Sequence, residues 1–199
     1  MKTLRVPLLL FALPAVLLAF AKSREGLFLL DRAGVEAGQF WRLWSGHWVH
    51  FSFSHAALNL AVLLAAGAWL EQVRPGLLWR HVVVAAPLTA LCILYFEPSL
   101  QAYGGLSGLA AGVVLLLALH QLIAPGRTRW IWIAVVLLLV AKAGWDAINP
   151  GTLLVDYRHP HVQTSRAAHA AGALVALGLH GTRWLCHRTQ TRAIPLANP

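Results

Sequence analysis

Six long apolar stretches divide this chain, and their length limits its fold more than any other feature. Each approaches the roughly 20 residues that a helix needs to cross about 30 Å of hydrocarbon. Inside lipid only helices and closed barrels satisfy every backbone polar group, and these runs lack the alternation of barrel strands. We therefore predict an all-α membrane protein, a compact bundle of six transmembrane helices that forms one domain over residues 1–199. The predicted spans are residues 5–21, 53–70, 79–96, 106–124, 130–145 and 167–184.

The first stretch has a second interpretation. Lys2 and Arg5 precede an apolar run that ends in Ala19-Phe20-Ala21, which is also the pattern of a secretory signal peptide. Cleavage after this run would leave five spans, so the sequence leaves the fate of the first helix open.

Charged residues are few, and their distribution predicts an orientation. Only 12% of residues are charged, against about 25% in ordinary globular chains. With both termini in the cytoplasm, most Lys and Arg residues fall on the cytoplasmic side, as the positive-inside rule predicts. Every acid except Glu71 then falls outside, which adds to the charge asymmetry. The formal net charge of +9 therefore reports orientation, and we expect a lipid bilayer rather than nucleic acid as partner. Lys142, inside the fifth span, is expected to reach outward and pair with Asp146.

Several polar residues lie within the predicted spans, where each needs a partner or a function. His55 and Asn59 share one face in the outer half of the second span. Ser107 opens the fourth span, where free backbone N–H groups favour a developing anion. His169 lies near the outer end of the sixth span. Together they supply a nucleophile, a general base and an oxyanion stabiliser, the minimum for acyl transfer.

Small residues flank these polar positions. Gly104, Gly108 and Gly112 recur every four residues, and Gly172 follows His169, so both helices have faces that allow close backbone approach. Each polar residue also has a plainer interpretation, because a buried Ser commonly bonds to its own helix and a His commonly joins two helices. Their coincidence at one depth favours a site.

At these residues the chain resembles the rhomboid family of intramembrane serine proteases. The matching residues, in family order along most of the chain, are Trp41, Arg42, His50, His55, Asn59, Glu71, Gly105, Leu106, Ser107, Gly108, Ala168, His169 and Gly172. The resemblance implies that Ser107 is the nucleophile and His169 its only catalytic partner, a dyad without a carboxylate. It also implies an oxyanion hole formed by His55, Asn59 and the Ser107 N–H.

The same resemblance assigns supporting roles and raises one difficulty. Trp41, Arg42 and His50 are expected to brace the first loop, residues 151–165 to form a flexible cap, and no metal or cofactor to be needed. Many rhomboids carry an aromatic residue four positions after the nucleophile, where it packs beneath the catalytic His. This chain has Ala111 there, so another group has to orient His169.

Within the family, the Gly-Gly-Leu-Ser-Gly and Ala-His-Ala-Ala-Gly-Ala segments resemble rhombosortases. That subfamily is associated with bacterial proteins that carry a C-terminal Gly-Gly tag, a membrane helix and a basic tail. The resemblance implies transmembrane protein substrates, a bacterial inner membrane and a site open to the periplasmic side. Hydrolysis and acyl transfer to another nucleophile both stay open.

Two other classes of function remain as alternatives. One is a catalytically inactive rhomboid-like scaffold that binds membrane helices. The other is a metal site or transporter built on His47, His50 and His55 with His159 and His161, although the chain contains no His-Glu-x-x-His motif. His120 and His180 lie toward the inner side and are expected to be interhelical or interfacial residues. Cys92 and Cys186 lie in apolar runs and form neither a disulfide framework nor a metal knuckle.

Overall fold

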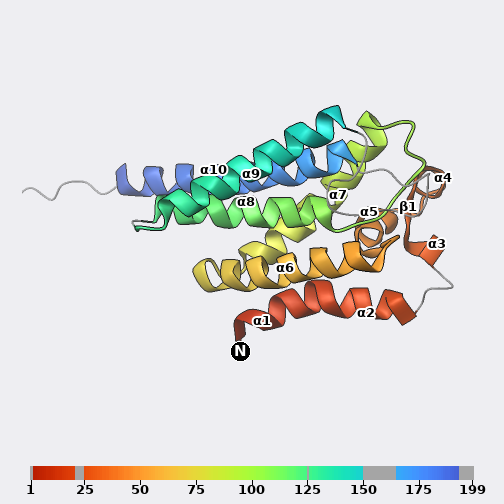
Figure 1. Ribbon diagram of the computed structural model, residues 1–199, viewed down its shortest axis with the longest axis horizontal. Coiled ribbons are helices and arrows are strands. Elements are labelled where there is room, and N and C mark those ends of the chain that lie inside the picture. The colour runs from red at the N-terminus through yellow and green to blue at the C-terminus, as the bar shows by residue number, and fades with distance from the viewer. Residues whose placement is uncertain (1, 21–24, 125, 150–164, 193–199) are drawn as a thin grey trace, which may run out of the picture.

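The computed structural model describes residues 2–20, 25–124, 126–149 and 165–192. Over these residues the long helices lie along a common direction, and the short elements gather at one end of the bundle (Figure 1). Helices α6, α8 and α10 begin at that end. The predicted all-α bundle is confirmed.

The long helical segments agree with the predicted spans to within a few residues, apart from the last. They are α1 (Lys2–Pro7), η1 (Leu8–Ala12), α2 (Leu13–Phe20), α6 (Phe53–Val73), α7 (Leu77–Phe96), α8 (Ser107–Ile123), α9 (Arg129–Ile148) and α10 (Arg166–Arg192). Ala21, the predicted end of the first span, lies outside the described residues. Helix α10 continues eight residues past its predicted end at Trp184.

Short elements form the first loop, between α2 and α6. They are α3 (Glu25–Phe28), β1 (Leu30–Asp31), α4 (Arg32–Glu36), α5 (Arg42–Ser45) and η3 (Gly46–Trp48). Strand β1 pairs antiparallel with β2 (Ala102–Tyr103), which lies just before α8. This pairing ties the first loop to the chain that leads into α8.

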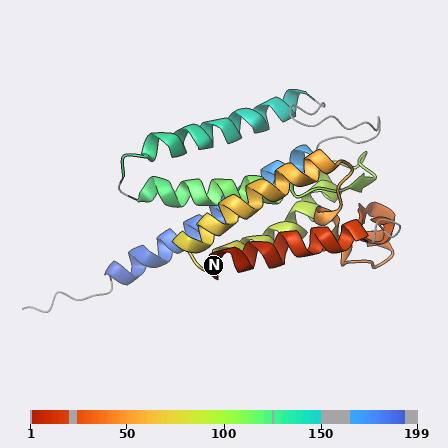
Figure 2. The same cartoon turned by 60° about the horizontal axis from the view of Figure 1, so that its bottom comes forward.

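The surface of the bundle suits hydrocarbon. Helices α6 and α7 have the length and mean hydropathy of membrane spans, whereas Leu4–Leu18 and Ser107–Ile123 are apolar but shorter. Helix α9 lies at the edge of the bundle along α8 (Figure 2), and it exposes Leu137 and Leu138 by 62% and 69%. Soluble proteins rarely expose such large apolar faces to water. The number of crossings, six or five, stays a prediction.

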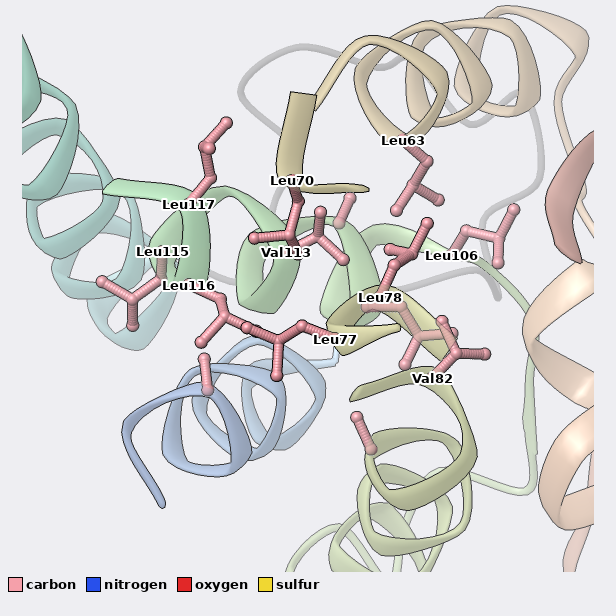
Figure 3. Close-up of a cluster of buried hydrophobic side chains, with 14 of the residues drawn as sticks. Leu63, Leu70, Leu77, Leu78, Val82, Leu106, Val113, Leu115, Leu116 and Leu117 are labelled. Atoms are coloured by element: carbon pink, nitrogen blue, oxygen red, sulfur yellow. The ribbon is translucent and has the colours of Figure 1, made fainter. Parts of the chain in front are cut away.

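The core lies between α6, α7 and α8. Figure 3 shows leucines and valines of these three helices pointing toward one another, and Leu63, Leu78 and Leu116 are fully buried. At the far end, the Glu71 carboxylate accepts hydrogen bonds from the backbone N–H groups of Gly76 and Leu78. The carboxylate thereby fixes the turn between α6 and α7, so these helices form a stable support for α8.

Candidate active site

Arg42 holds the first loop together. The residue is only 5% exposed, and Nη1 donates to the carbonyl oxygens of Gly26 and Leu29 at 2.7 and 2.6 Å. The neighbouring Trp41 donates from Nε1 to the carbonyl oxygen of Leu27 at 3.0 Å, while its ring stays half exposed. A guanidinium offers several N–H donors in one plane. The Arg42 side chain can therefore satisfy two carbonyl groups of the first loop at once.

His50 joins three segments. Its Nδ1 donates to the Trp48 carbonyl oxygen at 2.9 Å, which leaves Nε2 as an acceptor. That nitrogen receives two long hydrogen bonds, from the Leu106 N–H at 3.4 Å and from Asn59 Nδ2 at 3.5 Å. The His50 side chain therefore contacts the segment immediately before Ser107, beyond the first-loop brace that the resemblance implies.

His47 connects the first loop to α7. Its Nε2 donates to the Ala86 carbonyl oxygen on α7 at 2.8 Å, and its ring lies edge-on to Tyr103. Burial lowers the pKa of His47 to about 4. Among the residues that the structure describes, no group of three potential ligands could hold a metal ion. His159 and His161, named in the metal hypothesis, lie outside those residues.

Two glycines let the chain before α8 pack closely on the first loop and on α6. Gly105 has a φ of +139°, which other residues rarely adopt, and a Cβ there would lie 3.0 Å from His55 Cε1. A Cβ on Gly104 would lie 2.7 Å from the carbonyl oxygen of Val49. Ser107 is the first residue of α8, so this packing brings the chain that leads into Ser107 beside His55.

Helices α8 and α10 are in backbone contact beside Ser107 and His169. A Cβ on Gly108 would lie 2.6 Å from the Ala168 carbonyl oxygen, and a Cβ on Gly172 would overlap the carbonyl oxygen of Gly108. Ser107 precedes Gly108 and His169 follows Ala168. Each candidate catalytic residue is therefore next to a residue whose backbone contacts the other helix. Both are partly exposed at the end of the bundle.

The contact continues one turn along α8. A Cβ on Gly112 would lie 2.5 Å from the Gly172 carbonyl oxygen and would overlap the ring of His81 on α7. The small residues predicted on α8 and α10 therefore lie where three helices meet. Farther along the same two helices the rings of His120 and His180 are in contact, which confirms that these residues join helices.

Glu97, at the end of α7, caps the N-terminus of α10. Its carboxylate accepts from the Arg166 N–H at 2.8 Å, the Ala167 N–H at 3.3 Å and the Ser165 hydroxyl at 2.5 Å. Ser165 Oγ in turn accepts from the Ala168 N–H at 3.0 Å. These bonds satisfy the first donors of the helix, and they fix the turn that carries His169.

Asp146 on α9 reaches His169, which the resemblance did not imply. Its Oδ2 lies 3.0 Å from His169 Nδ1, off the direction of a straight hydrogen bond, so the contact is mainly electrostatic. Lys142 Nζ donates to both carboxylate oxygens at 2.7 and 2.5 Å, which confirms the predicted pair. Helix α9 continues past its predicted end at Trp145, and this extension places Asp146 on the helix.

A half-open cavity of about 560 Å³ lies beside this region, on another face of α10. Residues that line it include Cys92, Phe96, Glu97, Arg166, Ala170 and Leu174. Neither Ser107 nor His169 lines the cavity. The candidate catalytic side chains are therefore not part of it.

A family model described as the Rhomboid domain matches residues 37–185, which is most of the chain and includes every motif residue from Trp41 to Gly172. The chain belongs to the rhomboid family. Rhomboids are intramembrane proteases that act on membrane-protein substrates within the bilayer, so this rhomboid is a membrane protein. No curated protein sequence matches the chain.

Proposed function

We propose that this rhomboid is an active intramembrane serine protease, with Ser107 as nucleophile and His169 as general base. The observation that carries the proposal is the backbone contact of Gly108 with Ala168 and Gly172. Because of this contact, Ser107 and His169 project from two helices whose backbones touch at one end of the bundle. Ser107 also stands at the N-terminus of α8, where the helix dipole favours negative charge.

The reaction transfers one acyl group. Ser107 Oγ attacks the substrate carbonyl carbon while His169 takes the hydroxyl proton, and the carbonyl oxygen becomes an oxyanion. His169 then returns the proton to the leaving amine as the C–N bond breaks. Water attacks the ester, gives its proton to His169, and Ser107 Oγ recovers a proton as it leaves.

His55, Asn59 and the Ser107 N–H are the proposed oxyanion donors. His55 and Asn59 are buried on one face of α6, and the His55 ring lies against Gly105. The long hydrogen bond from Asn59 to His50 is weak enough to be exchanged for a bond to substrate. Donors fixed before the reaction stabilise the charge that develops in the transition state.

The proposed substrates are transmembrane proteins with a C-terminal Gly-Gly tag, cleaved at the periplasmic side of a bacterial inner membrane. A helical peptide bond is sterically hidden, and glycine costs a helix about 1 kcal/mol relative to alanine. A Gly-Gly segment therefore unwinds easily near Ser107. The cytoplasmic location of both termini belongs to this proposal and follows from the Lys and Arg distribution.

Co-expression with a Gly-Gly-tagged protein tests the proposal, with mass spectrometry of the product's new C-terminus. We expect cleavage by the wild type and none by Ser107→Ala or His169→Ala. Ser99→Ala, an exposed serine, serves as the matched control and should cleave normally. A product heavier than the hydrolysed one by the mass of an amine minus one water would show acyl transfer, and cleavage by Ser107→Ala would refute the proposed nucleophile. An inactive scaffold would release no product from any variant.

A further inference from the structure

We propose that Asp146 is a positioning residue for His169, so that the site works as a Ser-His-Asp arrangement. The inference rests on the proposed function, because it assigns a partner to the proposed general base. Three helices would then contribute one member each: α8 gives Ser107, α10 gives His169 and α9 gives Asp146.

The contact itself is the first support. Asp146 is only 2% exposed, and its Oδ2 lies 3.0 Å from His169 Nδ1. A carboxylate is rarely buried without a partner, because desolvating a charge costs several kcal/mol. Asp146 has two partners, the positively charged Lys142 ammonium and the His169 ring.

The orientation of the ring is the second support. With Nδ1 3.0 Å from the Asp146 carboxylate, Nε2 is the nitrogen left to accept the Ser107 proton, as the division of roles in a triad requires. The off-line approach of the carboxylate fits a resting site, because catalytic hydrogen bonds commonly align only when substrate is bound. The carboxylate also supplies the orientation that an aromatic residue would give at Ala111.

The charges around His169 predict a signature that a purely structural contact would lack. Asp146 and Lys142 face the ring from α9, Glu97 from the end of α7, and His55 from α6. The Asp146 carboxylate stabilises the imidazolium that forms when His169 takes the proton, and Lys142 opposes it. Neutralising Asp146 and neutralising Lys142 should therefore shift the pH–rate profile in opposite directions.

The test measures kcat, KM and the pH–rate profile of Asp146→Asn, Asp146→Glu and Lys142→Gln in purified protein. We expect Asp146→Asn to lower kcat on the order of 10²- to 10⁴-fold with KM unchanged, as in soluble triads. Its acid limb should move to lower pH, and that of Lys142→Gln to higher pH. Asp146→Glu, which keeps the charge, should recover part of the loss.

Two outcomes would overturn the inference. One is an Asp146→Asn variant whose kcat stays within about threefold of wild type with an unmoved acid limb. The other is a Lys142→Gln variant whose pH–rate profile has its acid limb at the same pH as wild type. This second outcome decides the question if Asp146→Asn fails to fold. Ser107→Ala is assayed in parallel: cleavage by that variant refutes the proposed function, whereas its inactivity beside a fully active Asp146→Asn refutes the role of Asp146 alone.

Discussion

Gly172 of α10 lies directly against the carbonyl oxygen of Gly108 of α8, so closely that a Cβ on Gly172 would overlap that oxygen. The contact is one residue from Ser107 and three from His169. No side chain separates the helices there, so the distance between nucleophile and base depends on the absence of a methyl group.

Gly172→Ala should therefore separate α8 from α10 and slow cleavage. Misplacing reacting groups by about 1 Å can cost about 100-fold in rate, and overpacking costs about 1–3 kcal/mol of stability. Cleavage rate and thermal unfolding in detergent measure the two effects. Gly178→Ala on the same helix is the matched control, because a Cβ at Gly178 would meet nothing within 4 Å. Equal rates for the two variants would contradict this account.

Asn59→Ala should lower kcat on the order of 10- to 1000-fold, by analogy with oxyanion-hole donors of soluble hydrolases. The substrate's ground state gains little from this donor, so KM should change little. Steady-state kinetics on a tagged substrate checks both values. Gln72→Ala, an exposed amide on the same helix, is expected to behave as wild type. An Asn59→Ala variant with wild-type kcat would remove Asn59 from the oxyanion hole.

Glu97→Ala should destabilise the protein by about 1–2 kcal/mol, the typical value of a lost helix cap. The change leaves the N–H groups of Arg166 and Ala167 without their acceptor. Cleavage should also fall, because His169 lies in the first turn of α10. Glu36→Ala, at an exposed glutamate of α4, is the control for thermal unfolding. If both variants unfold at the same temperature, the cap contributes no stability.

Acid should destabilise the protein through His47. Burial lowers the pKa of this residue from its ordinary value of 6.5 to about 4, so the unfolded chain binds the proton more strongly. Above pH 6.5 His47 is neutral in both the folded and the unfolded chain, and its protonation does not reduce the free energy of unfolding. Below pH 6.5 the free energy of unfolding falls by about 1.4 kcal/mol per pH unit until pH approaches 4. Thermal unfolding between pH 7 and pH 4.5 should show a smaller loss for His47→Gln than for wild type. Parallel curves would show that His47 does not titrate this way.

The length of the apolar runs was enough to predict the long helices. Apolar length located each long helix, and the predicted start of the second span at Phe53 is also the first residue of α6. The path of the first loop was not predictable, because Arg42 fixes it through carbonyl groups 13 and 16 residues earlier in the chain. No local pattern encodes contacts of that kind.

Asp146 illustrates a different limit. Its spacing from Lys142 on one helix already explained its charge, so nothing in the sequence called for a second partner. The contact with His169 depends on how α9 is rotated against α10, and that rotation is set by packing. The role of Glu97 was not predictable for the same reason. The sequence predicts only that Glu97 lies at the outer side, and its role as a cap depends on where α7 ends relative to α10.

Labelling with a fluorophosphonate probe, followed by peptide mass spectrometry, tests the central claim most directly. The probe forms a covalent bond with an activated serine hydroxyl, independently of any substrate. We predict a single adduct on Ser107 in the wild type, no adduct in Ser107→Ala and strongly slowed labelling in His169→Ala. An adduct on another serine, or unchanged labelling in Ser107→Ala, would contradict the assignment of Ser107 as the nucleophile.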